Sequence, residues 1–283
     1  MGRFDDKVAF ITGGARGMGR SHAVALAREG ADVAFCDVAA PGEAGEGART
    51  APYPLADVEG AAETVRLVEA EGRRCLALAA DIRDTEQIEG AVARAIEELG
   101  RVDFLIANAG ICTFAPFEQI TDAMWEEMIA VNLTGAFKSM RAVVPHMVER
   151  GEGRIVAIAS TAARTGAPNL AHYAASKWGL VGLTKSLALE LAAKGVTVNA
   201  VCPATVNTPM VHNEALYGLF APDVKQPTRE EVAPRYAALN PIPRPWLEPE
   251  EVTAAVLYLL GEEARGVTGA TLEVGLGSSA RTP

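Results

Sequence analysis

Tyr173 and Lys177 are the pair of residues whose types and spacing most directly suggest chemistry. They lie four residues apart in Tyr-Ala-Ala-Ser-Lys, a segment with a helical pattern, so one helix face should carry both side chains. A free tyrosine titrates near ~10, too high for an efficient base at neutral pH. A neighbouring ammonium favours phenolate, so we expect Lys177 to lower the pKa of Tyr173. The pair then predicts a general base for a secondary alcohol, although two ordinary helix residues would share this spacing.

Two further polar residues support this interpretation. Ser160 is expected to end a strand shortly before Tyr173, and its hydroxyl can hold the reacting oxygen. Lys177 can also bind the ribose of a nicotinamide cofactor. Asn132 lies on the preceding predicted helix, where it can bind a water that links Lys177 to solvent. The alternative for Asn132 is a helix-kink residue that bonds the backbone. Together the four residues predict an alcohol dehydrogenase site.

A glycine-rich segment predicts where a dinucleotide would bind. Residues 12–19 follow the first expected strand and open a helix. Glycines there permit a tight turn and close backbone approach to a pyrophosphate, which the helix N-terminus attracts. A helix cap or an ordinary turn is the alternative. The candidate cofactor-binding residues of this segment are Gly13, Arg16, Gly17, Met18 and Gly19.

Asp37 ends the second expected strand and indicates which nicotinamide cofactor binds. An acid about 20 residues beyond the glycines can accept both ribose hydroxyls of NAD and repels a 2′-phosphate. Arg16 is a counterargument, because it can reach such a phosphate. Asp37 is better placed, so we predict NAD.

The ends of the third and fourth expected strands supply more candidates. Ligands of an open α/β sheet lie outside the carboxyl ends of its strands. Asp81 can bond the adenine amino group there, or simply form a cap or turn. A local turn is also the alternative for the segment after the fourth strand. The candidates at these two ends are Asp81, Ile82, Asn108, Ala109 and Gly110.

The elements that must position these residues follow a regular alternation. Short, mostly apolar runs rich in β-branched residues alternate with helical patterns, as in parallel strands covered on both faces. We predict an α/β fold: one doubly wound, Rossmann-type domain over residues 1–283, with a seven-stranded parallel sheet and helices on both faces. The expected strands are residues 7–12, 32–37, 75–79, 103–107, 154–160, 196–202 and 271–274.

Two long segments interrupt this alternation. Residues 38–57, rich in proline and glycine, leave the chain directly after Asp37. We expect this insertion to cover the adenosine side of the cofactor with Val38, Tyr53 and Leu55, and so to slow cofactor release. Residues 207–247 carry many large apolar side chains and are the candidate substrate loop. Long loops are usually functional, but each segment is alternatively a tolerated surface insertion.

Composition excludes several other classes of protein. The 283 residues carry a formal net charge of −10 without a basic run, which argues against nucleic acid and anionic membranes. No apolar stretch approaches the ~18 residues of a membrane span. Four separated cysteines and four histidines show no metal-ligand spacing, so we expect no metal site and a reducing, cytoplasmic setting.

These motifs, in this order, resemble the short-chain dehydrogenase/reductase family from residue 7 to about residue 276. The resemblance implies the strand order 3-2-1-4-5-6-7 and a homo-oligomer, usually a tetramer. It also places the Pro203-Ala-Thr-Val-Asn-Thr208 segment at the nicotinamide, with Val206 and Thr208 bonding the carboxamide. Ala204 stands where the family usually has glycine.

The insertion after Asp37 resembles the mycofactocin-associated, carveol dehydrogenase-like subgroup. That resemblance implies tightly held NAD, alicyclic terpenoid-like alcohols and a mycofactocin-type redox carrier as partner. The alternatives are a dehydrogenase for another carbonyl substrate, an epimerase or dehydratase, and a non-catalytic NAD-binding regulator. A regulator would not need Asn132, Ser160, Tyr173 and Lys177, all of which are present.

Overall fold

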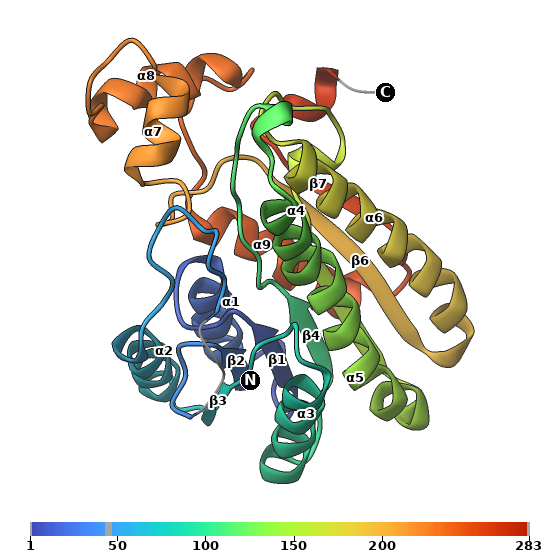
Figure 1. Cartoon of the computed structure of the whole chain (residues 1–283). Coiled ribbons are helices and arrows are strands. Elements are labelled where there is room, and N and C mark those ends of the chain that lie inside the picture. Colours follow the sequence, from blue (N-terminus) through green and yellow to red (C-terminus); the bar gives the residue numbers. More distant parts are fainter. Residues whose placement is uncertain (1, 43–46, 282–283) are drawn as a thin grey trace.

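The chain alternates strands and helices in the computed structural model, which describes residues 2–42 and 47–281 (Figure 1). Seven parallel strands form one sheet in the order β3-β2-β1-β4-β5-β6-β7, which confirms the predicted order. The fifth strand is shorter than predicted, so Ser160 follows the strand instead of ending it. The strands are β1 (Val8–Thr12), β2 (Asp32–Asp37), β3 (Cys75–Ala79), β4 (Phe104–Ala107), β5 (Gly153–Ile158), β6 (Val196–Pro203) and β7 (Thr271–Val274).

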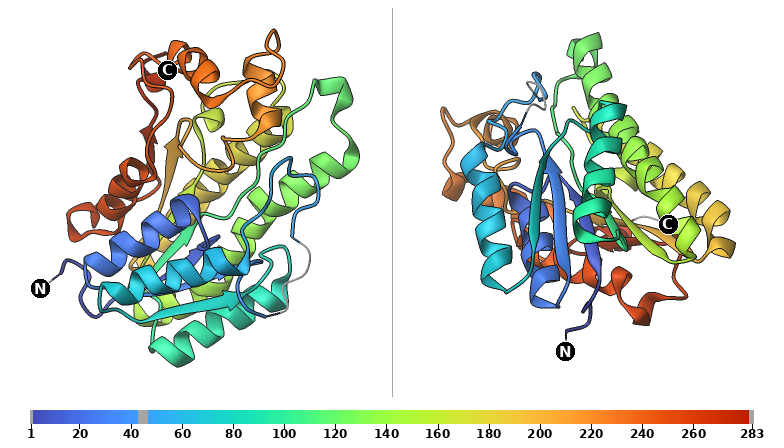
Figure 2. Two further views of the ribbon diagram at one scale, coloured as in Figure 1. Left: turned by 90° about the vertical axis from the view of Figure 1, so that its left-hand side faces the viewer. Right: turned by 90° about the horizontal axis from the view of Figure 1, so that it is seen from below.

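Helices cover both faces of this sheet, as predicted (Figure 2). Helices α1, α2 and α9 pack on one face, and α3, α5 and α6 on the other. The helices of the described residues are α1 (Gly17–Arg28), α2 (Val58–Ala70), α3 (Thr85–Leu99), α4 (Asp122–Ile129), α5 (Ala136–Arg150), α6 (Ala171–Leu191), α7 (Glu214–Phe220), α8 (Arg229–Leu239) and α9 (Pro249–Leu260). None of them is long and apolar enough to cross a bilayer.

Local chemistry sets where these helices begin and end. The Asp84 carboxylate caps α3 by accepting from the backbone N–H groups of Glu86 and Gln87, and Gly100 ends it at a left-handed φ of 88°. Pro249 occupies the first turn of α9, where its missing N–H costs nothing. The inner strands β1, β4 and β5 are fully buried and mostly apolar, because helices lie on both sides, whereas the edge strands β3 and β7 are only partly buried. The sheet therefore holds its carboxyl edge rigidly in place.

Two features depart from the regular alternation. The chain from α4 to α5 continues through a π-helical turn, Ala130–Gly135, and such turns are frequent at functional sites. Helices α7 and α8 belong to residues 207–247 and lie together at one end of the molecule (Figure 1). They surround a small apolar cluster of their own, centred on Ala221, Val232 and Tyr236. Residues 43–46 of the predicted insertion lie outside the described part of the chain.

Candidate active site

The glycine segment between β1 and α1 is shaped for close contact with a ligand. Gly13 and Gly17 have left-handed φ values of 71° and 56°. A Cβ on Gly19 would lie 2.0 Å from the carbonyl oxygen of Gly13, so only glycine fits there. Among the described residues, no side chain caps the N-terminus of α1 at Arg16. Its free N–H groups therefore suit a phosphate.

Asn108 fixes this loop from the end of β4. Its amide nitrogen donates to the carbonyl oxygens of Thr12 (2.9 Å) and Gly13 (3.0 Å). In return, the Thr12 hydroxyl accepts from the backbone N–H groups of Asn108 and Ala109. Asn108 thus positions the glycine loop through long-range hydrogen bonds, and it does not merely form the local turn that was its alternative.

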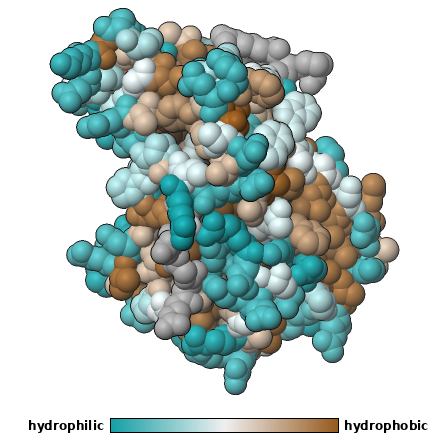
Figure 3. Space-filling model, in the orientation of Figure 1, coloured by the Kyte–Doolittle hydropathy of each residue, from teal (hydrophilic) through white to brown (hydrophobic). Residues whose placement is uncertain are grey.

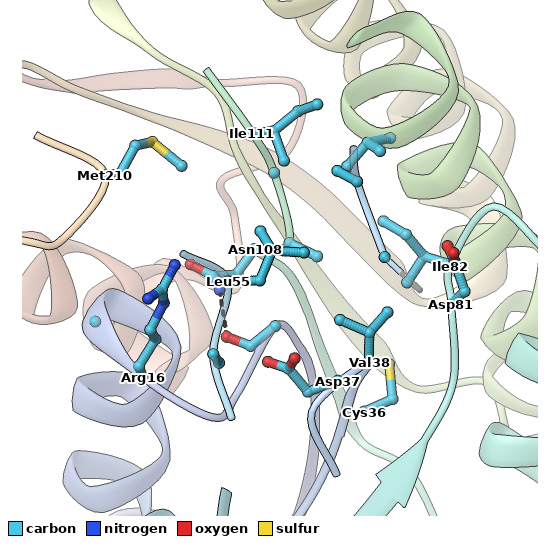
Figure 4. Close-up of a pocket in the computed structure, with 18 of the residues that line it drawn as sticks. Arg16, Cys36, Asp37, Val38, Leu55, Asp81, Ile82, Asn108, Ile111 and Met210 are labelled. Atoms are coloured by element: carbon cyan, nitrogen blue, oxygen red, sulfur yellow. Dashed lines mark hydrogen bonds between the residues drawn. The ribbon is translucent and has the colours of Figure 1, made fainter. Parts of the chain in front are cut away.

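Asp37 lies at the end of β2 beside the same loop, and its side chain is close to the loop in Figure 4. Its two carboxylate oxygens accept from the backbone N–H groups of Ala15 and Ala39, each at 3.1 Å. Burial raises the pKa of Asp37, while these bonds and Arg16 oppose the rise. Arg16 itself donates to the carbonyl oxygen of Pro54 at 2.7 Å. In this structure the Arg16 guanidinium therefore binds the backbone of the insertion.

Arg83 occupies the carboxylate of Asp81, the candidate adenine partner. Its Nε donates to both oxygens, at 3.0 and 2.8 Å, and its backbone N–H donates at 2.9 Å. The same guanidinium donates to the carbonyl oxygen of Gly47 at 2.6 Å and pairs with Glu127 at 3.2 Å. Arg83 therefore joins the end of β3 to the insertion and to α4.

Glu127 holds the next residues of the insertion. Its carboxylate accepts from the backbone N–H groups of Arg49 (2.9 Å) and Thr50 (2.7 Å), and from the Thr50 hydroxyl (2.5 Å). We call Arg83 and Glu127 the insertion clamp. The sequence analysis missed both, since neither lies in a motif and only the position of Arg83 directly after Asp81-Ile82 hinted at a role.

The described insertion residues and the strand ends enclose one pocket (Figure 4). Val38, Tyr53 and Leu55 line it, so all three residues expected to cover the cofactor face the predicted site. Tyr53 also reaches the segment that follows β4, because its phenolic oxygen accepts from the backbone N–H of Cys112 at 3.0 Å. The predicted cofactor-binding residues that line the pocket are Gly13, Arg16, Gly17, Met18, Asp37, Asp81, Ile82, Asn108, Ala109, Gly110 and Thr208.

The loop after β6 closes another side of this site. Thr208 lies next to the glycine loop, since a Cβ on Gly17 would be 3.4 Å from its Cγ2. Val206 is buried and pairs with Leu247 in an isolated bridge, and Pro203 ends β6. Neither Pro203 nor Val206 lines the pocket, so the structure brings only Thr208 of this group to it.

Lys177 is buried beneath Tyr173 on α6. Its Nζ lies 5.8 Å from the centre of the Tyr173 ring and donates to the carbonyl oxygen of Ile158 at 2.9 Å. Burial lowers the pKa of Lys177 to about 8, against weaker opposing effects of Cys112 and Cys202. The amine is therefore held at one place with a readily lost proton.

The pKa of Tyr173 corrects an expectation from the sequence. Burial raises it above its ordinary value, Cys112 and Tyr53 add to the rise, and a hydrogen bond with Ser160 opposes it. The predicted lowering of the Tyr173 pKa by Lys177 is wrong for the protein alone, because desolvation of the phenol dominates and the neighbouring Cys112 and Tyr53 add to the rise. Ser160 also accepts from the backbone N–H of Ala162 at 3.1 Å, which fixes its side chain.

Asn132 sits in the π-helical turn and bonds the backbone of a neighbouring segment. Its Oδ1 accepts from the N–H of Ile111 (2.8 Å) and its Nδ2 donates to the Ile111 carbonyl (2.9 Å). The structure therefore shows backbone bonding by Asn132, as in the alternative, while the predicted water link to Lys177 stays a prediction. A Cβ on Gly110 would lie 3.2 Å from Asn132 Oδ1 and 3.5 Å from Lys177 Nζ, so Gly110 lets the two approach.

Comparisons with known proteins agree with this arrangement. Residues 7–216 match the family model described as short chain dehydrogenase. The chain is 44% identical to a (-)-trans-carveol dehydrogenase of Rhodococcus erythropolis, over 99% of each chain. It superposes on carveol dehydrogenase from Mycobacterium avium in complex with NAD with a TM-score of 0.94 and 41% identity, covering 99% of this chain and 100% of that one. It also superposes on a short chain dehydrogenase from Mycobacterium paratuberculosis bound to NAD, with a TM-score of 0.88 and 35% identity, covering 99% of this chain and 100% of that one.

Proposed function

The chain belongs to the short-chain dehydrogenase family, and on that premise we propose that it is an NAD-dependent enzyme interconverting an apolar, alicyclic, terpenoid-like secondary alcohol and its ketone. The observation that carries the reaction is the buried Tyr173–Lys177 pair beside Ser160, with Lys177 next to Gly110, a residue that lines the pocket. The carveol dehydrogenase relatives support the substrate class.

The residues present fit NAD. Gly13 and Gly17 line the pocket, Gly19 lets the loop pack closely because a Cβ there would clash with the Gly13 carbonyl, and the N-terminus of α1 opens onto this loop. Asp37 would hold the adenosine ribose and Asp81 the adenine, once Arg83 shares its carboxylate. Thr208 would bond the carboxamide together with Val206. When bound, NAD supplies a nicotinamide ring that accepts a hydride from the alcohol carbon.

Tyr173 takes the hydroxyl proton of the alcohol in this proposal. Ser160 already bonds the phenol and would hold the reacting oxygen between them. Lys177 would stabilise the phenolate and bind the ribose, and its pKa of about 8 lets it pass a proton onward. Asn132 fixes the Ile111 backbone next to Gly110, which adjoins Lys177, and would position a relay water there.

The described insertion residues support tight binding of NAD. Tyr53 and the insertion clamp attach these residues to three separate parts of the body, and covering a ligand chiefly slows its release. NADH held in place would need reoxidation there, so we propose a mycofactocin-type carrier as the electron-accepting partner. A homotetramer is the proposed assembly, since Trp125, Phe137 and Trp178 leave large apolar surfaces exposed on α4, α5 and α6.

One experiment tests the reaction. Purified protein loaded with NAD is mixed with a panel of alicyclic secondary alcohols, and NADH absorbance is followed through a single turnover. We expect NADH to form in proportion to enzyme, with the matching ketone as product. Absence of NADH with every secondary alcohol, from protein shown to contain NAD, would overturn the proposal.

A further inference from the structure

The segment that follows β4, residues 108–115, is held by side chains from distant parts of the chain. We call it the post-β4 segment. Its first four residues line the pocket. Asn132 bonds both backbone groups of Ile111, and the backbone N–H of Cys112 donates to the Tyr53 phenol of the insertion. The position of this segment therefore determines the shape of the pocket on the side of β4.

Thr113 connects the post-β4 segment to the helix that carries Tyr173. Its Oγ1 lies 2.6 Å from Nε2 of His172, which directly precedes Tyr173 in the first turn of α6. Both side chains are buried, since Thr113 is 2% exposed and His172 0%. Close by, the backbone N–H of Ala115 donates to the carbonyl oxygen of Asn169 at 3.0 Å. Two hydrogen bonds thus join the post-β4 segment to the start of α6.

The bond to Thr113 is the only polar contact of the His172 ring among the residues that the structure describes. The Nδ1 atom of His172 is buried and has no hydrogen-bond partner there. Burial lowers the pKa of His172, so the ring is neutral at neutral pH. Within the same described residues, no side chain caps the N-terminus of α6. The Thr113 hydroxyl is therefore the side-chain group that anchors the turn carrying Tyr173 to the post-β4 segment.

We propose that Thr113 and His172 are positioning residues for Tyr173. The hydrogen bond between them holds the first turn of α6 against the post-β4 segment, and so fixes where the Tyr173 phenol lies relative to the pocket. Proton transfer requires hydrogen-bond reach between base and substrate, and small displacements of a reacting group slow a reaction strongly. The inference rests on the proposed dehydrogenase function and adds two residues that act through its general base.

Substitutions that remove or keep this one bond test the inference. Thr113→Val and His172→Leu remove it, whereas Thr113→Ser and His172→Gln retain a polar group that can form it. We expect single-turnover oxidation on NAD-loaded protein to slow about 10-fold in the first two variants, and to stay within about 2-fold of the wild type in the other two. The alcohol concentration for half-maximal rate and the NAD content should not change, because neither residue lines the pocket.

A control on the same helix separates a local effect from altered stability or assembly. The outer face of α6 carries the exposed side chains of Trp178 and Leu189, and apolar residues gather on this side of the molecule (Figure 3). Thr184 is buried further along α6, where its hydroxyl donates to the carbonyl oxygen of Leu180 at 2.8 Å. Thr184→Val makes the same chemical change away from Tyr173, so its oxidation rate should equal that of the wild type.

A double-mutant cycle shows whether the two residues act through one bond. If they do, the variant that combines Thr113→Val with His172→Leu should be no slower than the slower single variant. Losses that multiply would overturn the pairing. The cycle is measured as single-turnover rates, with melting temperatures recorded for each variant, and the separate Thr113 and His172 comparisons each test the inference if one removal variant does not fold.

The outcomes distinguish this inference from the parent proposal. Wild-type rates in both removal variants, or an equal loss in Thr184→Val, would overturn the positioning role. Equal losses in the removal variants and in Thr113→Ser and His172→Gln would also overturn it, since packing and not the hydrogen bond would then matter. A wild type that forms no NADH with any secondary alcohol would overturn the dehydrogenase proposal, and this inference with it.

Discussion

The phenolic oxygen of Tyr53 accepts a 3.0 Å hydrogen bond from the backbone N–H of Cys112. A residue of the insertion that follows β2 is thereby attached to the segment beside Tyr173, the proposed proton acceptor. Tyr53 is 7% exposed and contributes to the raised pKa of Tyr173. The insertion therefore touches both ends of the site, whereas the sequence suggested contact with the adenosine side only.

Tyr53→Phe should loosen the insertion and ease ionisation of the catalytic base. The variant keeps the ring but leaves the Cys112 N–H without its acceptor, which costs about 1–3 kcal/mol if water cannot replace it. Exchange of labelled NAD should quicken, and the alkaline limb of the pH–rate profile should move to lower pH. Identical exchange and pH profiles in variant and wild type would show that the bond has no such role.

Tyr173→Phe should abolish most turnover while leaving NAD in place. Loss of the proton acceptor removes the ~10²–10⁴-fold contribution typical of general acid–base catalysis. The glycine loop and Asp37 lie on other elements and are unchanged. Single-turnover NADH formation and NAD content, measured on the same preparation, check both statements. Wild-type turnover in this variant would rule out the proton transfer.

The rates of alcohol oxidation and of ketone reduction should depend on pH with opposite signs. Burial raises the pKa of Tyr173, so its phenolate fraction still grows through neutral and alkaline pH. Oxidation uses the phenolate and should quicken as pH rises, whereas ketone reduction uses the phenol and should slow. Single-turnover rates over this range, under conditions where hydride transfer limits the rate, measure both slopes. Flat profiles in both directions would argue against phenolate chemistry.

Asp37→Ala should weaken NAD binding and relax cofactor choice. The carboxylate accepts from the backbone N–H groups of Ala15 and Ala39, and its two oxygens have further lone pairs for the ribose hydroxyls. Removing it also removes the negative charge that repels a 2′-phosphate. Calorimetry with NAD and NADP on cofactor-stripped protein gives the two affinities. The wild type should prefer NAD by at least about 10-fold, and equal affinities would contradict the assignment.

The sequence predicted those features that depend on local pattern. The alternation of strands and helices, the strand order and the glycine positions follow from periodicity and resemblance, and the structure reproduces them. The pKa of Tyr173 could not be inferred in this way, because it is a balance between desolvation and charge that depends on packing. The four-residue spacing indicated that Lys177 lies beside Tyr173, but it contained no information on how deeply the phenol is buried.

Contacts between segments that lie far apart along the chain could not be predicted from the sequence either. Arg83 and Glu127 acquire their role only because α4 and the end of β3 approach the insertion in space. Tyr236 is one of several aromatic residues in residues 207–247, and nothing in its neighbours along the chain distinguishes it. Only the packing of α7 and α8 shows that its hydroxyl has no hydrogen-bond partner among the residues that the structure describes.

The insertion clamp should control how fast NAD leaves. Glu127 accepts three hydrogen bonds from Arg49 and Thr50 and pairs with Arg83, and its side chain is only 12% exposed. Charge-assisted hydrogen bonds contribute about 1.5–3 kcal/mol each. Glu127→Ala should therefore speed exchange of labelled NAD roughly 10- to 100-fold, since opening of the insertion precedes release.

The control for this variant is Glu126→Ala, an exposed carboxylate one residue earlier on the same helix. It matches the change in charge and helix propensity but leaves the clamp intact, so its exchange rate should equal that of the wild type. Single-turnover oxidation should persist in both variants, because Tyr173 and Lys177 lie on α6. If Glu127→Ala exchanges NAD no faster than Glu126→Ala, the clamp does not retain the cofactor, and the dehydrogenase proposal is unaffected.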